Sequence, residues 1–245
     1  MVRSLLGSAA LAALSLSACA QDTVAPADRA ATEKIVREYI LANPEIIEDA
    51  LIALNEQRKA EEEAGARIAV ADNADLLFNA SSDFSIGPDD APVTVVEFFD
   101  YRCGPCRASM TTINALPAKY QDQVRVVFKE FPILSEESQV AAIAALAAGR
   151  QGKYTEMHQA FMKSSSRFTE ADIVKIAEGL DLDMGQWRTD RADPALLAQI
   201  TETRLLAQTV GANATPTFVI GDTLFSGLNR ERLDSLITAE IAKAG

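Results

Sequence analysis

The sequence predicts an α/β domain that is interrupted by a block of helices and preceded by a separate helical segment. Three observations support this prediction. A nearly continuous β-branched run at 93–99 ends just before a Cys-Gly-Pro-Cys motif at 103–106. Helical patterns fill residues 135–209, and two short strand patterns follow within 215–226. With 245 residues, 48% of them hydrophobic, the chain can bury one sizeable core.

The first 18 residues have the layout of a secretory signal peptide. Arg3 supplies a positive charge, and the apolar stretch from Leu5 to Leu16 is too short for a stable membrane span. The sequence Leu-Ser-Ala-Cys at 16–19 fits a bacterial lipobox, which would make Cys19 a lipidated first residue and give the chain a lipid anchor. The alternative is ordinary cleavage after Ala20. Both alternatives predict export.

Residues 19–28 are expected to form a flexible leader, and residues 29–66 a helical segment. Asn43-Pro44-Glu45 predicts a second helix start within this segment. The segment is too short to bury its own apolar stripe, so we expect it to self-associate, with an intramolecular hairpin as the alternative. The charged stretch 55–67 should separate it from the main domain. The apolar residues at helical spacing are Ile35, Val36, Tyr39, Ile40, Ile47, Leu51 and Leu54.

The first half of the α/β domain is predicted at 75–134. It holds a buried strand at 93–99, a helix that runs from the cysteine motif to about Lys119, and a strand at 123–131. These three elements form a β-α-β unit.

The helical insert is predicted at 135–209, and the second half of the domain at 210–245. The second half contains two strands about a Gly221-Asp222 turn and a last helix that Asn229 caps. Helix starts in the insert are expected at Ser135, Thr169 and Asp193. The side chains expected in the core of the insert are Met157, Met162 and Trp187.

The closely spaced cysteines predict a dithiol redox centre. A zinc site would need two further ligands, but the exported chain offers only Cys103, Cys106 and one histidine, His158. His158 lies at helical spacing from Tyr154 and Phe161, which favours a partly buried structural residue. We therefore predict neither a metal site nor a cofactor.

The position of the motif at the start of a helix assigns different roles to its residues. Cys103 faces the unpaired N–H groups and the positive end of the helix dipole, which favour its thiolate. We expect Cys103 to be the exposed, attacking sulfur and Cys106, one turn further and more enclosed, to resolve the mixed disulfide. Gly104 would let a substrate backbone approach closely, and Pro105 costs no hydrogen bond in the first turn.

The segments FDYRCGPCR and ATPTFVIG, with the helical block between them, resemble the thioredoxin-fold disulfide oxidoreductases of the DsbA-like branch. The resemblance covers about residues 75–245 and implies a thioredoxin fold with an inserted helical subdomain. It also implies that the Thr215–Pro216 bond is cis and that Pro216 faces the disulfide. The Thr215 backbone would then pair with an extended substrate segment.

The resemblance further implies a role for Glu97, six residues before Cys103. The family keeps an acid here to relay protons to the second cysteine, and burial in an apolar strand would raise its pKa. The alternative is a solvated edge residue. Lys129, on the neighbouring strand, would pair with Glu97 or be an ordinary surface lysine.

The direction of electron flow rests on the residues around the motif. The strongest oxidants of the family carry a histidine between the cysteines, whereas this chain has Gly-Pro, which predicts a less oxidising couple. Thr215 before the proline resembles the isomerase members. Arg102 and Arg107 flank the motif and would act in the opposite direction by stabilising a thiolate. Isomerase or reductase is therefore favoured, with a dithiol oxidase as the alternative.

Together, the N-terminal helices and the DsbA-like domain resemble the ScsC (suppressor of copper sensitivity protein C) group. This resemblance implies a homotrimer formed through 29–66, a DsbD-type membrane reductase as electron donor, and exported cysteine-containing substrates in the periplasm. The alternatives are a protein that binds Cu(I) through the two thiolates and a lipoprotein scaffold that acts through its helices. The net charge of −12 argues against nucleic acid as a partner.

Overall fold

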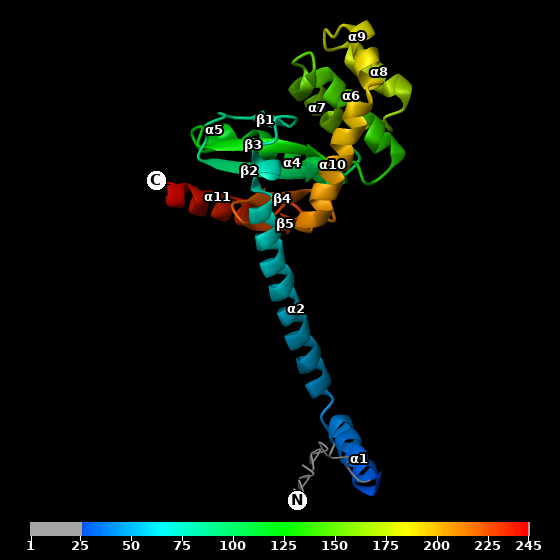
Figure 1. The fold of residues 1–245 in the computed structure, drawn as a ribbon, viewed down its shortest axis with the longest axis vertical. Helices are drawn as coiled ribbons and strands as arrows, with labels where there is room; N and C mark the ends of the chain where they lie inside the picture. Colours follow the sequence, from blue (N-terminus) through cyan, green and yellow to red (C-terminus); the bar gives the residue numbers. More distant parts are fainter. Residues whose placement is uncertain (1–25, 245) are drawn as a thin grey trace, which may run out of the picture. The chain divides into compact units, whose positions relative to one another are not determined.

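The computed structural model describes residues 26–244 (Figure 1). The predicted signal peptide, Cys19 and the leader up to residue 25 lie outside the described residues. Among the helices of residues 26–244, none combines the length and hydrophobicity that a bilayer crossing requires. The chain divides into two compact units, residues 1–56 and 57–245.

The first unit contains α1 (Pro26–Ala42) and the beginning of α2 (Glu45–Asp72). Helix α1 begins before residue 29, so the predicted leader is partly helical. Asn43 does not cap α2 as predicted, because its side-chain amide donates instead to the Tyr39 carbonyl at the end of α1 (2.8 Å). Pro44 separates the two helices because it lacks the N–H that a continuous helix would need.

The apolar side chains of this unit are exposed, which contradicts an intramolecular hairpin that buries them. Their exposed fractions range from 37% to 72%. An apolar surface of this extent on a helix is typical of an interaction site. The residues are Ile35, Val36, Tyr39, Leu41, Ile46, Ile47, Leu51, Ile52 and Leu54.

Helix α2 does not end where the charged stretch 55–67 begins. It is a single helix of 28 residues to Asp72, and Val70 near its end is buried in the core of the second unit. The stretch is rich in Glu, Gln, Lys, Arg and Ala, which are strong helix formers, and it contains no proline. The stretch that was predicted to separate the N-terminal segment from the main domain is therefore only a change in composition within one helix.

The second unit is built on a five-stranded sheet with the order β1-β3-β2-β4-β5 (Figure 1). The parallel pair β2–β3 forms its centre, and the other neighbours pair antiparallel. This confirms the predicted β-α-β unit and the C-terminal hairpin. The short edge strand β1 was not predicted. The bounds are β1 Phe84–Ile86, β2 Val93–Phe99, β3 Val124–Glu130, β4 Thr217–Ile220 and β5 Thr223–Ser226.

Helices cover both faces of the sheet. Alternate residues of β2 enter two separate cores: Val95 and Phe99 belong to the larger one, and Val96 and Phe98 to the smaller one. The larger core includes residues of α4 (Gly104–Asn114), α5 (Leu116–Lys119) and α11 (Arg230–Ala244), and the smaller one includes residues of α3 (Ala74–Phe78).

Two predictions concern the ends of these helices. The helix expected from the motif to Lys119 is broken at Ala115, because Pro117 lacks the N–H that a continuous helix would bond to the carbonyl four residues earlier. At the last helix, Asn229 Oδ1 accepts the Arg232 N–H (2.9 Å), which confirms the predicted cap.

The insert consists of five helices that follow β3 (Figure 1). Ser135, Thr169 and Asp193 cap three of them as predicted. Trp187 is fully buried and its indole N–H donates to the Ala144 carbonyl (3.0 Å). Met157 and Met162 are buried too. The bounds are α6 Glu136–Gly149, α7 Tyr154–Lys163, α8 Glu170–Glu178, α9 Met184–Arg191 and α10 Pro194–Val210.

Candidate active site

The Cys-Gly-Pro-Cys motif lies where β2 ends and α4 begins. Cys103 is the N-cap of α4, and its Sγ accepts the Cys106 backbone N–H at 3.3 Å. Pro105 lies in the first turn, where no N–H is needed. Gly104 is exposed, and a Cβ built there would meet no described atom within 4 Å. The surface over the first turn is therefore open to an approaching chain.

The two thiols are free and have different environments. The hydrogen bond from the Cys106 thiol lowers the pKa of Cys103 to about 6, while burial raises the pKa of Cys106 far above its usual range. Near neutral pH the pair therefore holds one thiolate and one thiol. Cys106 is fully buried as expected. Cys103 is 5% exposed, and whether this is enough to form a mixed disulfide stays a prediction.

The loop before β4 accounts for this enclosure. The Thr215–Pro216 peptide bond is cis, the geometry that the resemblance implied. The Thr215 carbonyl oxygen lies 3.2 Å from Cys103 Sγ, although the two residues are 112 positions apart in the chain. Thr217 anchors the loop by donating from its hydroxyl to the Ala214 carbonyl (2.7 Å).

Glu97 is a buried acid on the α4 side of the sheet. It is 2% exposed, which contradicts the alternative of a solvated edge residue, and burial raises its pKa to about 8. The Ser109 hydroxyl of α4 donates to Glu97 Oε1 (3.0 Å) and lies 2.7 Å from the Cys106 carbonyl oxygen. Ser109 thus connects the acid to the backbone of the enclosed cysteine.

Lys129 does not pair with Glu97, and it is not a surface residue. In the parallel register Lys129 lies opposite Phe98, whereas Glu97 lies opposite Phe128. Because side chains alternate between the faces of a strand, Lys129 points away from the Glu97 face. It is buried on the other side, where it pairs with Asp83 and donates to a carbonyl of α3.

The two arginines that flank the motif bind the insert. Arg102 forms an ion pair with Glu137 (2.8 Å) and also donates to Ser135 Oγ (3.2 Å). Arg107 donates to the Ser164 carbonyl (3.1 Å). Both guanidinium groups thus have partners in the insert or just before it, and an influence on the Cys103 thiolate remains a prediction.

Several buried polar residues near the motif were not predicted. Asp100 accepts four hydrogen bonds just before the motif. Glu130 Oε1 accepts from the hydroxyls of Tyr101 (2.7 Å) and Tyr154 (2.9 Å). The available signal was the position of both acids at the end of an apolar strand, where burial of a charge needs a reason.

His158 belongs to the same cluster and is more buried than predicted. Its Nδ1 lies 3.3 Å from the Tyr101 hydroxyl, and burial lowers its pKa to about 3. Within residues 26–244, no cluster of three or more His, Cys, Asp or Glu residues is arranged to hold a metal ion.

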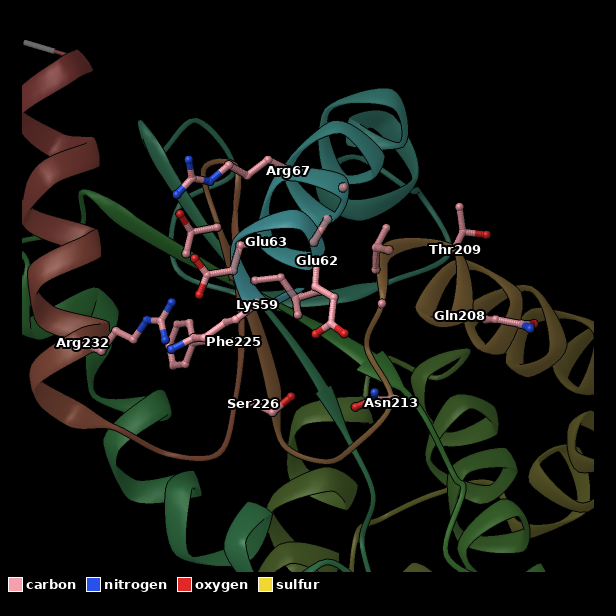
Figure 2. Close-up of a pocket in the computed structure, with 16 residues that line it drawn as sticks. Lys59, Glu62, Glu63, Arg67, Gln208, Thr209, Asn213, Phe225, Ser226 and Arg232 are labelled. Atoms are coloured by element: carbon pink, nitrogen blue, oxygen red, sulfur yellow. The ribbon is translucent and has the colours of Figure 1, made fainter. Parts of the chain in front are cut away.

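A separate hollow of about 560 Å³ lies beside β5 (Figure 2). Its lining includes the part of α2 from Lys59 to Arg67 and the end of α10. The Arg232 side chain also lines the hollow and lies over the Phe225 ring at 5.0 Å. None of the motif residues lines it.

Two families match the chain. The family described as thioredoxin matches residues 79–239, and the one described as the copper resistance protein ScsC N-terminal domain matches residues 28–61. The crystal structure of a thioredoxin-like oxidoreductase from Silicibacter pomeroyi DSS-3 is 40% identical, with a TM-score of 0.66 over 71% of this chain and 99% of that one. ScsC of Proteus mirabilis in a transitional conformation is 28% identical, with a TM-score of 0.65 over 89% and 98% of the two chains.

A curated relative is much longer than this chain. The Na(+)/H(+) antiporter NhaA 3 of Salinispora tropica is 32% identical over 195 residues, which make up 73% of this chain and 30% of the antiporter. The chain thus spans less than a third of that relative's length. The family matches and the solved structures lead to one conclusion: the chain belongs to the thioredoxin family, and its N-terminal helices are similar to the ScsC N-terminal domain.

Proposed function

We propose that the protein exchanges disulfides with exported proteins through Cys103 and Cys106. The observation that supports this proposal best is the difference between the two thiols. The pKa of Cys103, whose Sγ accepts the Cys106 backbone N–H, is lowered to about 6, and Cys106 is a buried thiol near an acid. This arrangement separates an attacking sulfur from a resolving one.

The reaction proceeds in two exchange steps. The Cys103 thiolate attacks one sulfur of a substrate disulfide, so that a mixed disulfide forms and the other substrate sulfur leaves as a thiolate. Cys106 then transfers its proton towards Glu97 and attacks Cys103 Sγ. The substrate leaves as a dithiol, and the enzyme is left oxidised with a Cys103–Cys106 disulfide. The Thr215 backbone and the open surface over Gly104 and Pro105 would hold the substrate segment.

We propose the isomerase or reductase direction for this exchange. In isomerisation a second substrate cysteine, rather than Cys106, resolves the mixed disulfide, and the enzyme returns to the reduced state. The Gly-Pro pair between the cysteines and Thr215 before the cis-proline support this direction. A DsbD-type membrane reductase would supply the electrons that keep the dithiol reduced.

We further propose that the helices of the first unit assemble the chain into a homotrimer. The exposed apolar residues of α1 and the beginning of α2 support this, as does the match of residues 28–61 to the ScsC N-terminal domain. Leu51→Glu should yield a monomer, because the substitution places a charge on the apolar face. Glu56→Gln, which leaves the apolar face unchanged, is the control. Light scattering after gel filtration measures the mass, and an unchanged mass for Leu51→Glu would contradict this role of α2.

The proposed location is the periplasm, with a lipid anchor at Cys19. The apolar stretch 5–16 and the lipobox-like residues 16–19 support it. Mass spectrometry of the protein purified from membranes tests the anchor, since a diacylglyceryl group on Cys19 adds a defined mass that Cys19→Ser would lack. Ordinary cleavage after Ala20 would instead give a chain that starts at Gln21.

The equilibrium with glutathione tests the redox function itself. A couple near about −180 mV or below supports an isomerase or reductase, whereas one near about −120 mV supports the oxidase. Cys103→Ser should abolish the couple, and Cys106→Ser should accumulate mixed disulfides with substrate. If the parent protein shows no two-electron couple but retains Cu(I) only while both cysteines are present, the copper-binding alternative replaces this proposal.

A further inference from the structure

Asp100 is a buried acid that the exchange steps above do not use. Only 1% of its surface is exposed. Its Oδ1 accepts hydrogen bonds from the Arg102 backbone N–H (2.7 Å) and the Ser138 hydroxyl (2.8 Å). Its Oδ2 accepts hydrogen bonds from the backbone N–H groups of Ile133 (2.9 Å) and Leu134 (3.0 Å). The four donors occupy the acceptor positions of the two carboxylate oxygens. The buried charge is therefore held by specific hydrogen bonds.

These contacts join two segments that are distant in the sequence. The Asp100 carbonyl accepts the Cys103 N–H (3.0 Å), so the residue holds the turn that leads into the motif. Its carboxylate holds the loop after β3 and the first turn of α6, where Ser138 lies. Asp100 therefore helps to hold the motif against the insert, together with the contacts of Arg102 and Arg107.

The Asp100 charge is not neutralised by a cation. All four donors to the carboxylate are neutral, and among residues 26–244 no Lys, Arg or His forms an ion pair with it. The nearby guanidinium of Arg102 pairs with Glu137 of α6 instead. The other acid that faces Asp100 is Glu130 of β3, whose raised pKa reflects burial first and the Asp100 charge last.

The uncompensated charge acts against the thiolate. The hydrogen bond from the Cys106 thiol lowers the pKa of Cys103, burial raises it, and the Asp100 charge adds a smaller increase in the same direction as burial. In this class of dithiol, the couple becomes more oxidising as the thiolate of the reduced form is stabilised. A negative charge beside Cys103 therefore makes the couple less oxidising.

We propose that Asp100 is a positioning residue that holds the motif against the insert and, by its unneutralised charge, keeps the disulfide couple of the protein less oxidising. This inference rests on the proposed disulfide exchange and adds to it a residue that sets its direction. The Asp100 charge would act in the same direction as the Gly-Pro pair between the cysteines.

Two substitutions compare the charge with the hydrogen bonds. Asp100→Asn removes the charge and keeps Oδ1 as an acceptor for the Arg102 N–H and the Ser138 hydroxyl, but its amide NH2 no longer accepts the Ile133 and Leu134 N–H groups. Ser138→Ala removes one of the hydrogen bonds and keeps the charge. The full chain is equilibrated with reduced and oxidised glutathione, and the thiolate of Cys103 is followed by its ultraviolet absorbance against pH.

The expected results differ between the two variants. Asp100→Asn should raise the equilibrium constant for reduction of the enzyme disulfide about tenfold and lower the pKa of Cys103 by about one unit. Ser138→Ala should leave both quantities within about twofold of the parent. If Asp100→Asn does not fold, Asp100→Ser tests the same loss of charge, because its hydroxyl can still accept the Arg102 N–H.

Either of two outcomes would overturn the inference. An unchanged constant and pKa in the neutral variants would show that the charge has no influence on the couple. An equal shift in Ser138→Ala would show that the loss of a hydrogen bond, not of the charge, is responsible. A parent protein without any titratable two-electron couple would instead overturn the proposed function.

Discussion

Glu97 and Cys106 are both enclosed on the same side of the sheet, and the hydroxyl of Ser109 lies between them. This hydroxyl is 3.0 Å from Glu97 Oε1 and 2.7 Å from the Cys106 carbonyl oxygen. A hydroxyl has a single proton, so it can donate to only one of the two. If it donates to the Cys106 carbonyl, a protonated Glu97 can donate to Ser109 in turn. A pKa of about 8 for Glu97, raised by burial, agrees with such a protonated acid.

Replacing Glu97 by Gln should slow the resolving step about 100-fold, because Cys106 then loses its proton acceptor. In the parent protein this step should accelerate as the pH rises through about 8, where Glu97 becomes a carboxylate. The variant should lack that acceleration. The measurement is the release of glutathione from a mixed disulfide preformed at Cys103. Ser109→Ala, which keeps the carboxyl group, should have a smaller effect, and equal rates and pH profiles for Glu97→Gln and the parent would exclude the relay.

The free energy of unfolding should fall as the pH rises from about 4.5 to about 8, because burial raises the pKa of both Glu97 and Glu130 to about 8 from an ordinary 4.5. The folded state binds the protons more tightly, so this stability is fully present below the unfolded pKa and is lost as the pH rises through the folded value.

Glu130→Gln isolates one of these protons. Its side chain can still accept the hydroxyls of Tyr101 and Tyr154. For each pH unit within that range, the free energy of unfolding of the variant should therefore fall by about 1.4 kcal/mol less than that of the parent. Urea unfolding of the reduced protein at several pH values measures the slope. The comparison with the parent cancels other titrating groups, including Cys103, whose lowered pKa acts in the opposite direction. Parallel pH profiles would show that Glu130 is ionised in the folded protein.

Removing the charge of Lys129 should lower the free energy of unfolding by about 3 to 5 kcal/mol, because it leaves Asp83 buried without its partner. We expect Lys129→Met to show this loss in urea unfolding. The double variant with Asp83→Leu should recover part of it, since neither charge then remains inside. A double variant that is less stable than Lys129→Met would contradict this account of the pair.

Gly149→Ala should destabilise the protein by about 1 to 3 kcal/mol, because a Cβ there would overlap the Phe84 ring. That ring is stacked on Tyr154 at 4.0 Å and cannot move aside freely. Gly65→Ala is the matched control: it lies within α2 with open space around it and should be neutral or slightly stabilising. Thermal unfolding of both variants tests the contrast, which equal melting temperatures would refute.

The sequence was sufficient to predict the central architecture. The β-branched run of β2 and the capping residues Ser135, Thr169 and Asp193 are local signals, and each was found where it was expected. The cysteine motif and the proline pattern at 215–216 are also local, so the order of residues alone is enough to locate the candidate site.

What the sequence could not predict depends on register and tertiary contacts. The register between β2 and β3 places the Lys129 side chain on the face of the sheet opposite to Glu97, and this face determines its partner. The enclosure of Cys103 follows from a loop 112 residues away. Asp100 appears in the sequence as one polar residue after an apolar strand, and its four donors become apparent only when the loop after β3 and the start of α6 are placed around it.

The burial of Trp187 determines what intrinsic fluorescence can report about this protein. It is the only indole of the chain, it donates to the Ala144 carbonyl within the insert, and the Arg191 guanidinium lies 4.6 Å from its ring centre. Its emission therefore follows the integrity of the insert. Loosening of the insert can thus be followed by exciting this one residue.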